Sequence, residues 1–398
     1  MFPALRGRDY RLYWWTGLVS NIGSWVQTAT HQWLVLTLTN SAFMLGFVGF
    51  IGSLPNVFFA LIGGVVADRV ERKRLLALTQ SLFMLYALAF GFLTLTRTIN
   101  IYWICSIAFL SGLTMAFDAP ARQSLVAFLV DRPFLSSAVA LNSASFNTAR
   151  ILGPAAAGVL IPIVGMPPSF FINAASFVPL IFALYSIRTV TTSNQTAEGS
   201  LWTDLLAGLR YVRSEPTILK LIILVAAPCF FAMPYWTLLP YFAKNVLHSG
   251  VRGFGALASS AGIGAVLGAL ILARTAQNGG RGRLLLTAAF VNSMALTVFA
   301  LSRVFWFSAA ALLVVGATII MYTANVNGLI QDLAKDEYRG RVMSAYLLVF
   351  MGTMPLANLQ AGTLAHYLGA PAPLEIGAAC LFLVALYAAI RMPDIRAL

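Results

Sequence analysis

The chain has 398 residues, of which 59% are hydrophobic and only 10% are charged, and its mean hydropathy is +0.82. A soluble globular domain has about 45–50% apolar and about 25% charged residues, so this chain lacks the charged surface that it would need in water. The composition excludes a soluble enzyme, a disordered protein and a secreted disulfide scaffold. The net charge of +13 would suit a nucleic-acid partner, unless the basic residues have a topological role.

Apolar runs of about 20 residues, long enough to cross a bilayer, recur along the whole chain. Twelve of them predict an all-α integral membrane protein with twelve transmembrane helices. The predicted spans are 12–38, 42–67, 75–96, 101–130, 136–163, 169–187, 218–242, 251–273, 284–301, 305–333, 342–366 and 374–390.

The basic residues predict the orientation of these spans. If the N-terminus is cytoplasmic, 21 of the 26 Lys and Arg residues fall on the cytoplasmic side. Cytoplasmic loops are the ones that carry excess Lys and Arg. We therefore expect a multi-pass protein of the cytoplasmic membrane with both termini inside. The topology of the spans then accounts for the net positive charge. We therefore expect the lipid bilayer as a partner, and we expect no nucleic-acid partner.

A polar stretch at 188–216 separates the spans into two groups of six. We expect an N-terminal six-helix half at 1–187, a cytoplasmic linker at 188–216 and a C-terminal half at 217–398. Part of the linker predicts an amphipathic helix on the inner membrane surface, because six apolar residues share one helical face. They are Leu201, Trp202, Leu205, Leu206, Leu209 and Val212.

The two halves resemble each other at one constant offset in residue number. Gly158 matches Gly362, Gly165 matches Gly369, and Gly64 matches Gly268. Two six-helix halves in parallel orientation imply a substrate site between them near the middle of the membrane, reached by rocking. We therefore expect a small-molecule substrate, and we expect the protein to be a monomer.

The predicted turn between spans 2 and 3 combines a glycine, an acid and a basic cluster. The residues are Gly64, Asp68, Arg69, Arg72 and Lys73. Flanking basic residues are ordinary on the cytoplasmic side, but the acid is not explained by that rule. A carboxylate here can cap a neighbouring helix or pair with an arginine, and so latch an inner gate.

This turn resembles the loop 2–3 signature of the major facilitator superfamily, from which it departs at Val66 and Glu71. The resemblance covers the whole chain, and it implies twelve helices in two pseudo-symmetric halves. It also implies that Asp68 stabilises the outward-facing state. The second half keeps Gly268 but has Leu272 and Ala273 where the acid would be.

The fifth span carries Gly153, Pro154 and Gly158, a pattern that permits close packing and a kink. A plain packing face is one interpretation. The run also resembles an exporter-associated helix 5 motif, and this likeness favours export. The runs 8–11 and 118–123 further resemble the branch that contains enterobactin exporters and macrolide-efflux drug:proton antiporters. That branch includes siderophore export and multidrug resistance.

Asp118 and Arg150 are equally far from Phe134 along the chain, one before it and one after it, and Phe134 is near the turn between spans 4 and 5. At a rise of about 1.5 Å per residue, both are about 24 Å from that turn. A lone charge at such depth is costly, so we predict a pair or a shared polar network. It is either purely structural or couples proton binding to gating. His31 is a candidate proton relay, or else a hydrogen-bonded helix-end residue.

Polar and aromatic side chains within the spans predict the lining of a substrate cavity. Amide and aromatic groups with few charges suit a bulky amphipathic organic molecule, such as a drug or a siderophore-like metabolite. The candidates are Asn21, Thr28, Gln32, Tyr235, Trp236, Tyr322, Asn325 and Asn358. The helix that carries Tyr235 and Trp236 also holds Pro228, Pro234 and Pro240, which are candidate hinges.

The chain lacks the residues that other functions require. No Walker A phosphate cradle is present, so an ion gradient, with protons as the expected coupling ion, would drive transport. The three cysteines and three histidines are scattered, so we expect no metal and no cofactor, and no catalytic residues predict an enzyme. An importer on the same fold and a non-transporting receptor or assembly factor are the alternatives.

Overall fold

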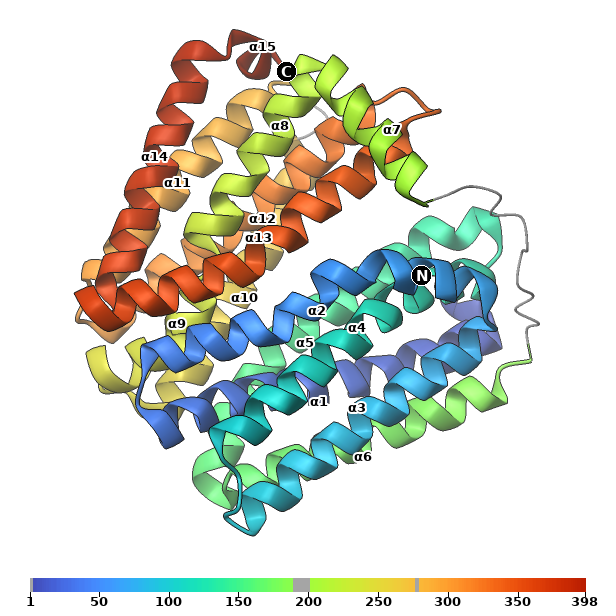
Figure 1. The fold of residues 1–398 in the computed structure, drawn as a ribbon, viewed down its shortest axis with the longest axis vertical. Coiled ribbons are helices and arrows are strands. Elements are labelled where there is room, and N and C mark those ends of the chain that lie inside the picture. Colours follow the sequence, from blue (N-terminus) through green and yellow to red (C-terminus); the bar gives the residue numbers. More distant parts are fainter. Residues whose placement is uncertain (1–2, 189–200, 276–278) are drawn as a thin grey trace. The chain divides into compact units, whose positions relative to one another are not determined.

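The computed structural model of the protein describes residues 3–188, 201–275 and 279–398, and every regular element there is helical (Figure 1). In chain order the elements are η1 (Pro3–Arg6), α1 (Arg8–Thr39), α2 (Ala42–Arg69), α3 (Arg72–Leu95), α4 (Ile101–Leu129), η2 (Arg132–Phe134), α5 (Leu135–Val164), α6 (Met166–Ser186), α7 (Leu201–Ser214), α8 (Pro216–Ala227), η3 (Pro228–Ala232), α9 (Tyr235–Tyr241), η4 (Phe242–Val246), α10 (Gly250–Thr275), α11 (Arg281–Leu301), α12 (Phe305–Leu333), α13 (Arg339–Leu368), α14 (Pro371–Arg391) and α15 (Pro393–Ala397).

Eleven of the predicted spans coincide with helical segments that are long and apolar enough to cross a membrane. These segments begin and end within a few residues of the predicted bounds, which confirms an all-α integral membrane protein. The remaining span, α1, is 32 residues long. It carries several amide and hydroxyl side chains, so its place as a twelfth transmembrane helix stays a prediction.

The seventh span is broken where its prolines lie. α8 ends at Ala227, and the five residues from Pro228 to Ala232 form a π-helical turn before α9 begins. A proline has no backbone N–H and its ring clashes with the preceding turn, so it kinks or breaks a helix. Here the helix breaks at Pro228, whereas α5 continues through Pro154. Single π-helical turns are frequent at functional sites. The hinge predicted near Tyr235 and Trp236 therefore corresponds to a real interruption.

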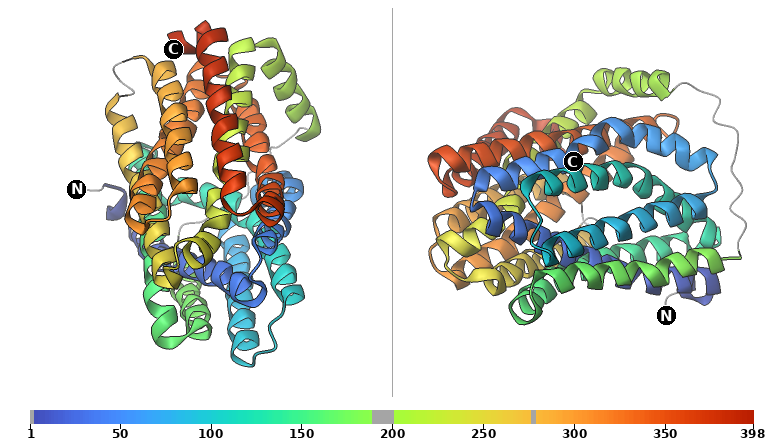
Figure 2. Two further views of the ribbon diagram at one scale, coloured as in Figure 1. Left: turned by 90° about the vertical axis from the view of Figure 1, so that its left-hand side faces the viewer. Right: turned by 60° about the horizontal axis from the view of Figure 1, so that its bottom comes forward.

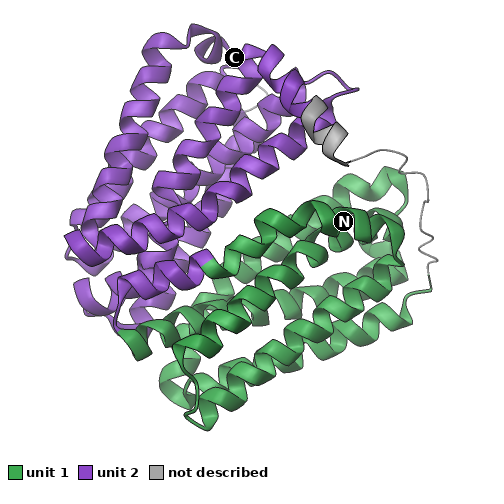
Figure 3. Cartoon of the chain, in the orientation of Figure 1, with its two compact units in different colours: residues 1–39, 51–197 green, residues 40–50, 198–398 purple. Residues whose placement is uncertain are grey.

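The helices group into two compact units, which Figure 3 colours separately. The first contains Met1–Thr39 and Ile51–Ala197, and the second contains Asn40–Phe50 and Glu198–Leu398. The start of α2 differs from the predicted halves because Gly46 lies directly against the backbone of Asn358 in α13. The predicted division into 1–187, 188–216 and 217–398 otherwise stays a prediction.

In the first unit, α1 packs against α5 and α6, and α3 packs against α6 and α4. Hydrogen bonds from long side chains fix the N-terminal end of α1 to α5. The Tyr10 hydroxyl donates to the carbonyl oxygen of Ala138 at 2.9 Å, and Trp14 Nε1 donates to that of Leu141 at 3.0 Å. The N-terminal end of α1 is therefore held at a defined register.

In the second unit, α12 packs against α10 and α11, and α11 also packs against α14. Gly316 of α12 lies so close to the carbonyl of Ala261 in α10 that no Cβ would fit. Gly112, its match in the first half under the repeat offset, lies in the same way against the carbonyl of Gly52. The sequence repeat therefore has a counterpart in helix packing, since each unit joins two helices through a glycine contact.

The linker contains a helix, α7, which packs on the connection between α12 and α13. The ring of Tyr211 stacks in parallel on that of Tyr338, with 4.3 Å between centroids. The Tyr211 hydroxyl also accepts a hydrogen bond from the backbone N–H of Lys335 at 3.4 Å. Residues 189–200 of the predicted linker and the side chains of Leu201, Trp202, Leu205 and Leu206 lie outside the described residues.

Near the start of α8, α15 is tied to that helix by an ion pair. Lys220 Nζ lies 2.7 Å from a carboxylate oxygen of Asp394, and the neighbouring side chain of Ile395 is fully buried. The hydrogen bond from Lys220 lowers the pKa of Asp394 below its usual value. A lowered pKa means that folding favours the charged carboxylate.

We expect Gly316→Ala to destabilise the protein by about 1–3 kcal/mol, because its Cβ would overpack the contact with Ala261. Gly352→Ala is a matched control in α13, since nothing lies near the added Cβ there. It should leave stability unchanged or raise it slightly. Thermal unfolding of the purified protein in detergent measures both changes, and equal shifts for the two variants would contradict the close contact.

The Lys220–Asp394 pair predicts a pH-dependent stability. Asp394→Asn should lower stability by about 0.5 kcal/mol at neutral pH, as is usual for a partly exposed ion pair. Because the pKa of Asp394 is lowered, the stabilisation is present above its usual pKa and is lost as the pH falls through the lowered value. Thermal unfolding near pH 3 should therefore show a smaller difference between the variant and the unmodified protein. A difference that stays constant with pH would exclude this origin.

Candidate functional site

Asp118 of α4 is the centre of a buried polar cluster in the first unit. Its Oδ1 accepts hydrogen bonds from the Thr79 hydroxyl at 2.7 Å and the Gln80 amide at 2.6 Å, both on α3. Its Oδ2 accepts a hydrogen bond from Arg122 Nε at 3.3 Å. Asp118 is only 3% exposed, so its charge must be compensated inside the protein. The cluster provides that compensation and joins α3 to α4.

The predicted pairing of Asp118 with Arg150 is wrong. Asp118 pairs instead with Arg122, which lies four residues further along the same helix and so on the same face. α4 packs chiefly against α3 and makes only slight contact with α5, so equal depth alone does not bring Arg150 to Asp118. The sequence spacing of 118 and 122 contained this signal, and the depth argument overlooked it.

His31 also lies apart from Asp118. Its ring packs against Phe90, with 5.1 Å between centroids. Its Nε2 is buried and has no hydrogen-bond partner among the residues that the structure describes. Asp118 and His31 therefore do not share the single network that the sequence predicted.

The turn between α2 and α3 separates the predicted latch residues. Asp68 and Arg69 are exposed, and Asp68 makes no hydrogen bond or ion pair within the described part of the chain. Lys73 pairs with Glu71 at 3.3 Å. Glu71, which departs from the family signature, is thus a local ion-pair partner of Lys73. Gly64 has open space around its Cα.

Arg72 is buried against α4 and does not share the exposed position of Asp68. Its Nε donates to the Ser124 hydroxyl at 2.5 Å, and its guanidinium lies 4.2 Å from the ring centroid of Phe128. Arg72 is the first residue of α3, so it fixes the N-terminal end of that helix. We call it the first anchor arginine.

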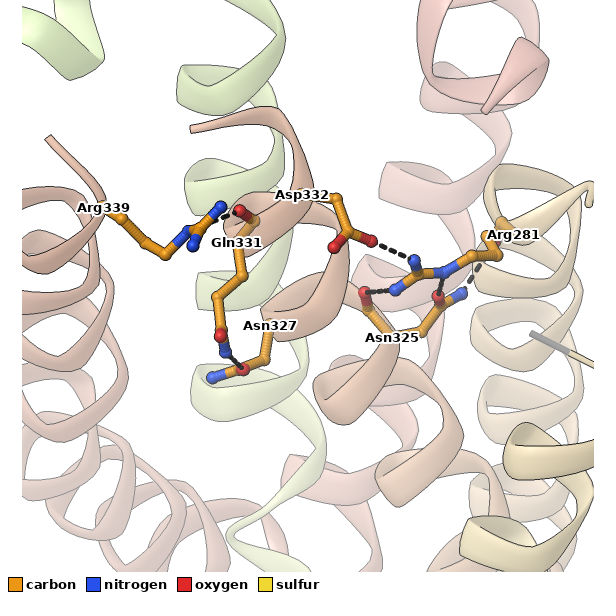
Figure 4. Close-up of polar contacts among 6 residues, drawn as sticks. All are labelled: Arg281, Asn325, Asn327, Gln331, Asp332 and Arg339. Carbon is orange, nitrogen blue, oxygen red and sulfur yellow. Dashed lines mark hydrogen bonds and ion pairs between the residues drawn. The ribbon is translucent and has the colours of Figure 1, made fainter. Parts of the chain in front are cut away.

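Arg281 has the corresponding place in the second unit, as the first residue of α11 (Figure 4). It lies against Gly328 and pairs with Asp332, and the repeat offset matches these two positions to Ser124 and Phe128. The offset found in the sequence therefore also relates the partners of the two anchor arginines. An aromatic partner in the first unit is replaced by a carboxylate in the second.

Asn325 completes the second anchor. Its Oδ1 accepts from Arg281 Nε at 3.0 Å, and its Nδ2 donates to the Arg281 carbonyl oxygen at 2.7 Å (Figure 4). The placement of Asn325 in a substrate cavity is thereby corrected, because both of its polar atoms bind Arg281. On the other side of α12, Arg339 Nε donates to the Gln331 carbonyl oxygen at 3.0 Å.

The predicted polar face of α1 is partly used for helix contacts. Asn21 Nδ2 donates to the Ser145 hydroxyl of α5 at 3.1 Å. Thr28 is exposed and bonds the carbonyl oxygen of Ser24 in its own helix. Gln32 Oε1 is buried without a hydrogen-bond partner in the described residues. Thr28 and Gln32 remain candidates for substrate contact, and Asn21 is already engaged.

The exporter-like motif lies where α5 contacts α1. Gly153 is packed so tightly against Trp25 that a Cβ would clash with it. Pro154 and Gly158 are buried as well. The motif is therefore a close helix–helix contact in this structure, beside Trp25, whose ring contacts Phe146 edge-on at 5.6 Å.

The aromatic candidates of the second unit lie around the broken span. Tyr235 is 2% exposed and contacts Trp236 edge-on at 6.4 Å. The Thr237 hydroxyl donates to Asn358 Oδ1 at 2.7 Å, so Asn358 joins α9 to α13. Tyr322 is buried, and its hydroxyl donates to the Leu224 carbonyl oxygen at 2.9 Å. Tyr322 and Asn358 therefore act in packing within this structure.

No three His, Cys, Asp or Glu side chains gather where they might hold a metal ion in the described ranges. The buried polar groups instead join spanning helices to one another. Paired charges within apolar spans and a span broken at a proline are features of an integral membrane protein with polar contacts between its helices.

Comparison with known proteins identifies the family. Residues 1–398 match a family model described as Transmembrane secretion effector. The Staphyloferrin A transporter of Staphylococcus aureus is 27% identical, over 85% of each chain. The Multidrug efflux pump Tap of Mycolicibacterium fortuitum is 25% identical, over 88% of each chain. The protein therefore belongs to this family of the major facilitator superfamily, and it is a transporter and not an enzyme.

Solved structures agree on the fold. The crystal structure of a bacterial homolog of the human lysosomal transporter Spinster, in an inward-facing and unoccupied conformation, has a TM-score of 0.79. The match covers 100% of this chain and 99% of that chain at 12% sequence identity. The major facilitator fold predicted from the sequence is confirmed.

We expect Arg281→Gln to destabilise the second unit by about 1–2 kcal/mol, because it removes charge-assisted hydrogen bonds at the start of α11. Arg283→Gln is the matched control, since Arg283 is exposed two residues away. Thermal unfolding in detergent compares the two variants. Equal stability of both variants would contradict the anchoring role of Arg281.

Proposed function

We propose that this protein exports a small amphipathic organic molecule, a drug or a siderophore-like metabolite, across the cytoplasmic membrane in exchange for protons. The observation that carries this proposal is the agreement between relatives that match 85% or more of the chain. They are named as a staphyloferrin A transporter and a multidrug efflux pump. Transport would proceed by alternating access, with both termini in the cytoplasm and the protein acting as a monomer.

The packing of α5 on α1 supports export. The sequence Gly153-Pro154 resembles the exporter-associated motif, and the contact of Gly153 with Trp25 leaves no room for any larger residue. Small residues at helix contacts permit close approach of two backbones. A fixed contact at this point would let α1 and α5 move as one body during transport.

Asp68 is the proposed latch of the inner gate. Its carboxylate is exposed at the end of α2, and it makes no bond in the described part of this structure. It is therefore available to accept hydrogen bonds in a different conformation. The neighbouring Arg69 is exposed as well, whereas Arg72 is already committed to Ser124.

Asp118 is the proposed proton-coupling group. Protonation would cancel its ion pair with Arg122, which lies on the same helix, and leave the Arg122 guanidinium free to bind elsewhere. The hydroxyl of Thr79 and the amide of Gln80 would still hold the side chain in place. A proton would then change the balance between conformations without unfolding the unit.

The export proposal is tested by untargeted mass spectrometry of cells and medium, with and without the gene. We expect a metabolite that stays inside the deletion strain and disappears from its medium. Dissipating the proton gradient in the unmodified strain should reproduce the same retention. A metabolite that instead becomes depleted inside the deletion strain and remains in the medium would identify an importer.

For the coupling role, we expect Asp118→Asn to keep the fold and substrate exchange but to lose accumulation driven by an imposed pH gradient. The loss should be about tenfold or more, which corresponds to about 1.4 kcal/mol of driving free energy. Asp131→Asn is the control, because Asp131 is exposed just beyond the end of α4. Transport of a fluorescent substrate into inverted vesicles, with and without the gradient, measures the effect. Gradient-driven accumulation by Asp118→Asn at the unmodified rate would refute the role.

A further inference from the structure

A groove lies along the second unit between α11 and α14, which run side by side (Figure 1, Figure 2). Its volume is about 460 Å³. The side chains that line it are mostly apolar or small, with two hydroxyls and one carboxylate. They are Ser293, Met294, Thr297, Leu301, Glu375, Ala378, Ala379, Phe382 and Leu383.

The groove faces away from the core of the unit. Met294, Leu301 and Leu383 are 60–65% exposed, although they lie on helices apolar enough to cross a membrane. An exposed apolar face on a spanning helix is in contact with hydrocarbon and not with water. The natural occupant of this groove is therefore a molecule that arrives from the bilayer.

Glu375 is the charged member of this lining. Its side chain is half-buried and makes no hydrogen bond or ion pair within the ranges that the structure describes. An isolated carboxylate at membrane depth is costly, and such residues mark functional sites. A cation that enters the groove would remove this cost.

The carboxylate of Glu375 lies near one end of the groove. Glu375 is four residues after Pro371, so it lies about 6 Å from the end of α14. Leu301 is the last residue of α11 and lines the same end. Leu383 lies eight residues beyond Glu375, about 12 Å deeper along the helix. This order, charge first and hydrocarbon below, matches a lipid with a cationic head.

We propose that the groove binds a phospholipid with an amine head group, such as phosphatidylethanolamine. The ammonium group pairs with Glu375, and an acyl chain lies along Met294, Ala379 and Leu383. With the proposed cytoplasmic N-terminus, this lipid belongs to the outer leaflet. The site is independent of the transported substrate, because it involves only α11 and α14.

The chemistry of the lining selects among membrane lipids. No Lys, Arg or His lines the groove, so an anionic head group would meet only Glu375 and be repelled. Phosphatidylglycerol is therefore the discriminating comparison lipid, since it has the same chains without the amine. A charge-assisted hydrogen bond to a half-buried carboxylate gives about threefold to fivefold preference, which corresponds to about 1 kcal/mol.

The test measures lipids bound to the purified full-length protein by native mass spectrometry, in detergent with equal dioleoyl phosphatidylethanolamine and dioleoyl phosphatidylglycerol. We expect the unmodified protein to retain the amine lipid about threefold to fivefold more than Glu375→Gln does. Glu337→Gln is the control, because it removes the same charge from an exposed turn far along the chain. Ala379→Leu keeps the carboxylate but fills the groove, and it should also lose the lipid.

Several outcomes would overturn the proposal. Equal retention of the two lipids by the unmodified protein would show that the amine is not recognised. Equal retention by Glu375→Gln and Glu337→Gln would remove the role of the carboxylate. Dodecyltrimethylammonium that binds in a Glu375-dependent manner, while neither lipid is retained, would assign the groove to a cationic amphiphile. Thermal unfolding of each variant confirms that lost binding does not reflect lost folding.

Discussion

The neutralisation of charge within apolar helices is the constraint on which this structure depends. A charged side chain in a spanning helix has no water to solvate it, so the protein must supply its partners. Asp118 receives three hydrogen bonds from side chains of α3 and α4. The helices that supply those partners are thereby held together, and the polar groups act as joints between otherwise apolar elements.

The two anchor arginines apply the same principle at the helix starts. Arg72 binds a hydroxyl and an aromatic ring, and Arg281 binds an amide and a carboxylate. Their partner positions are related by the sequence repeat, although the arginines themselves are not, since the offset matches Arg281 to Ala77. Because this correspondence reaches individual contacts, it supports two units of common architecture more strongly than matching glycines do.

Function in this family depends on which polar groups are engaged and which are available. Asn325 and Tyr322 are bound to neighbouring helices, whereas Asp68 and Thr28 are exposed. Glu375 belongs to the available group, and it lines the groove between α11 and α14. The transporter thus presents polar groups in two environments, which suggests that lipid binding and substrate transport use separate residues.

The amino-acid sequence is enough to predict the helical membrane architecture and the bounds of the spans, because bilayer thickness and backbone hydrogen bonding leave few alternatives to an apolar helix. Its motifs are enough to predict the superfamily. It also locates the interruption of the seventh span, since proline acts locally. The partners of buried polar groups, in contrast, depend on tertiary packing. Asp118 and Arg150 have equal depth in the sequence, but α4 turns its carboxylate toward α3 and Arg122. The sequence predicts Asn325 as a cavity residue, but Asn325 binds Arg281. Packing between segments that are distant in the sequence decides which neighbour each face of a helix meets.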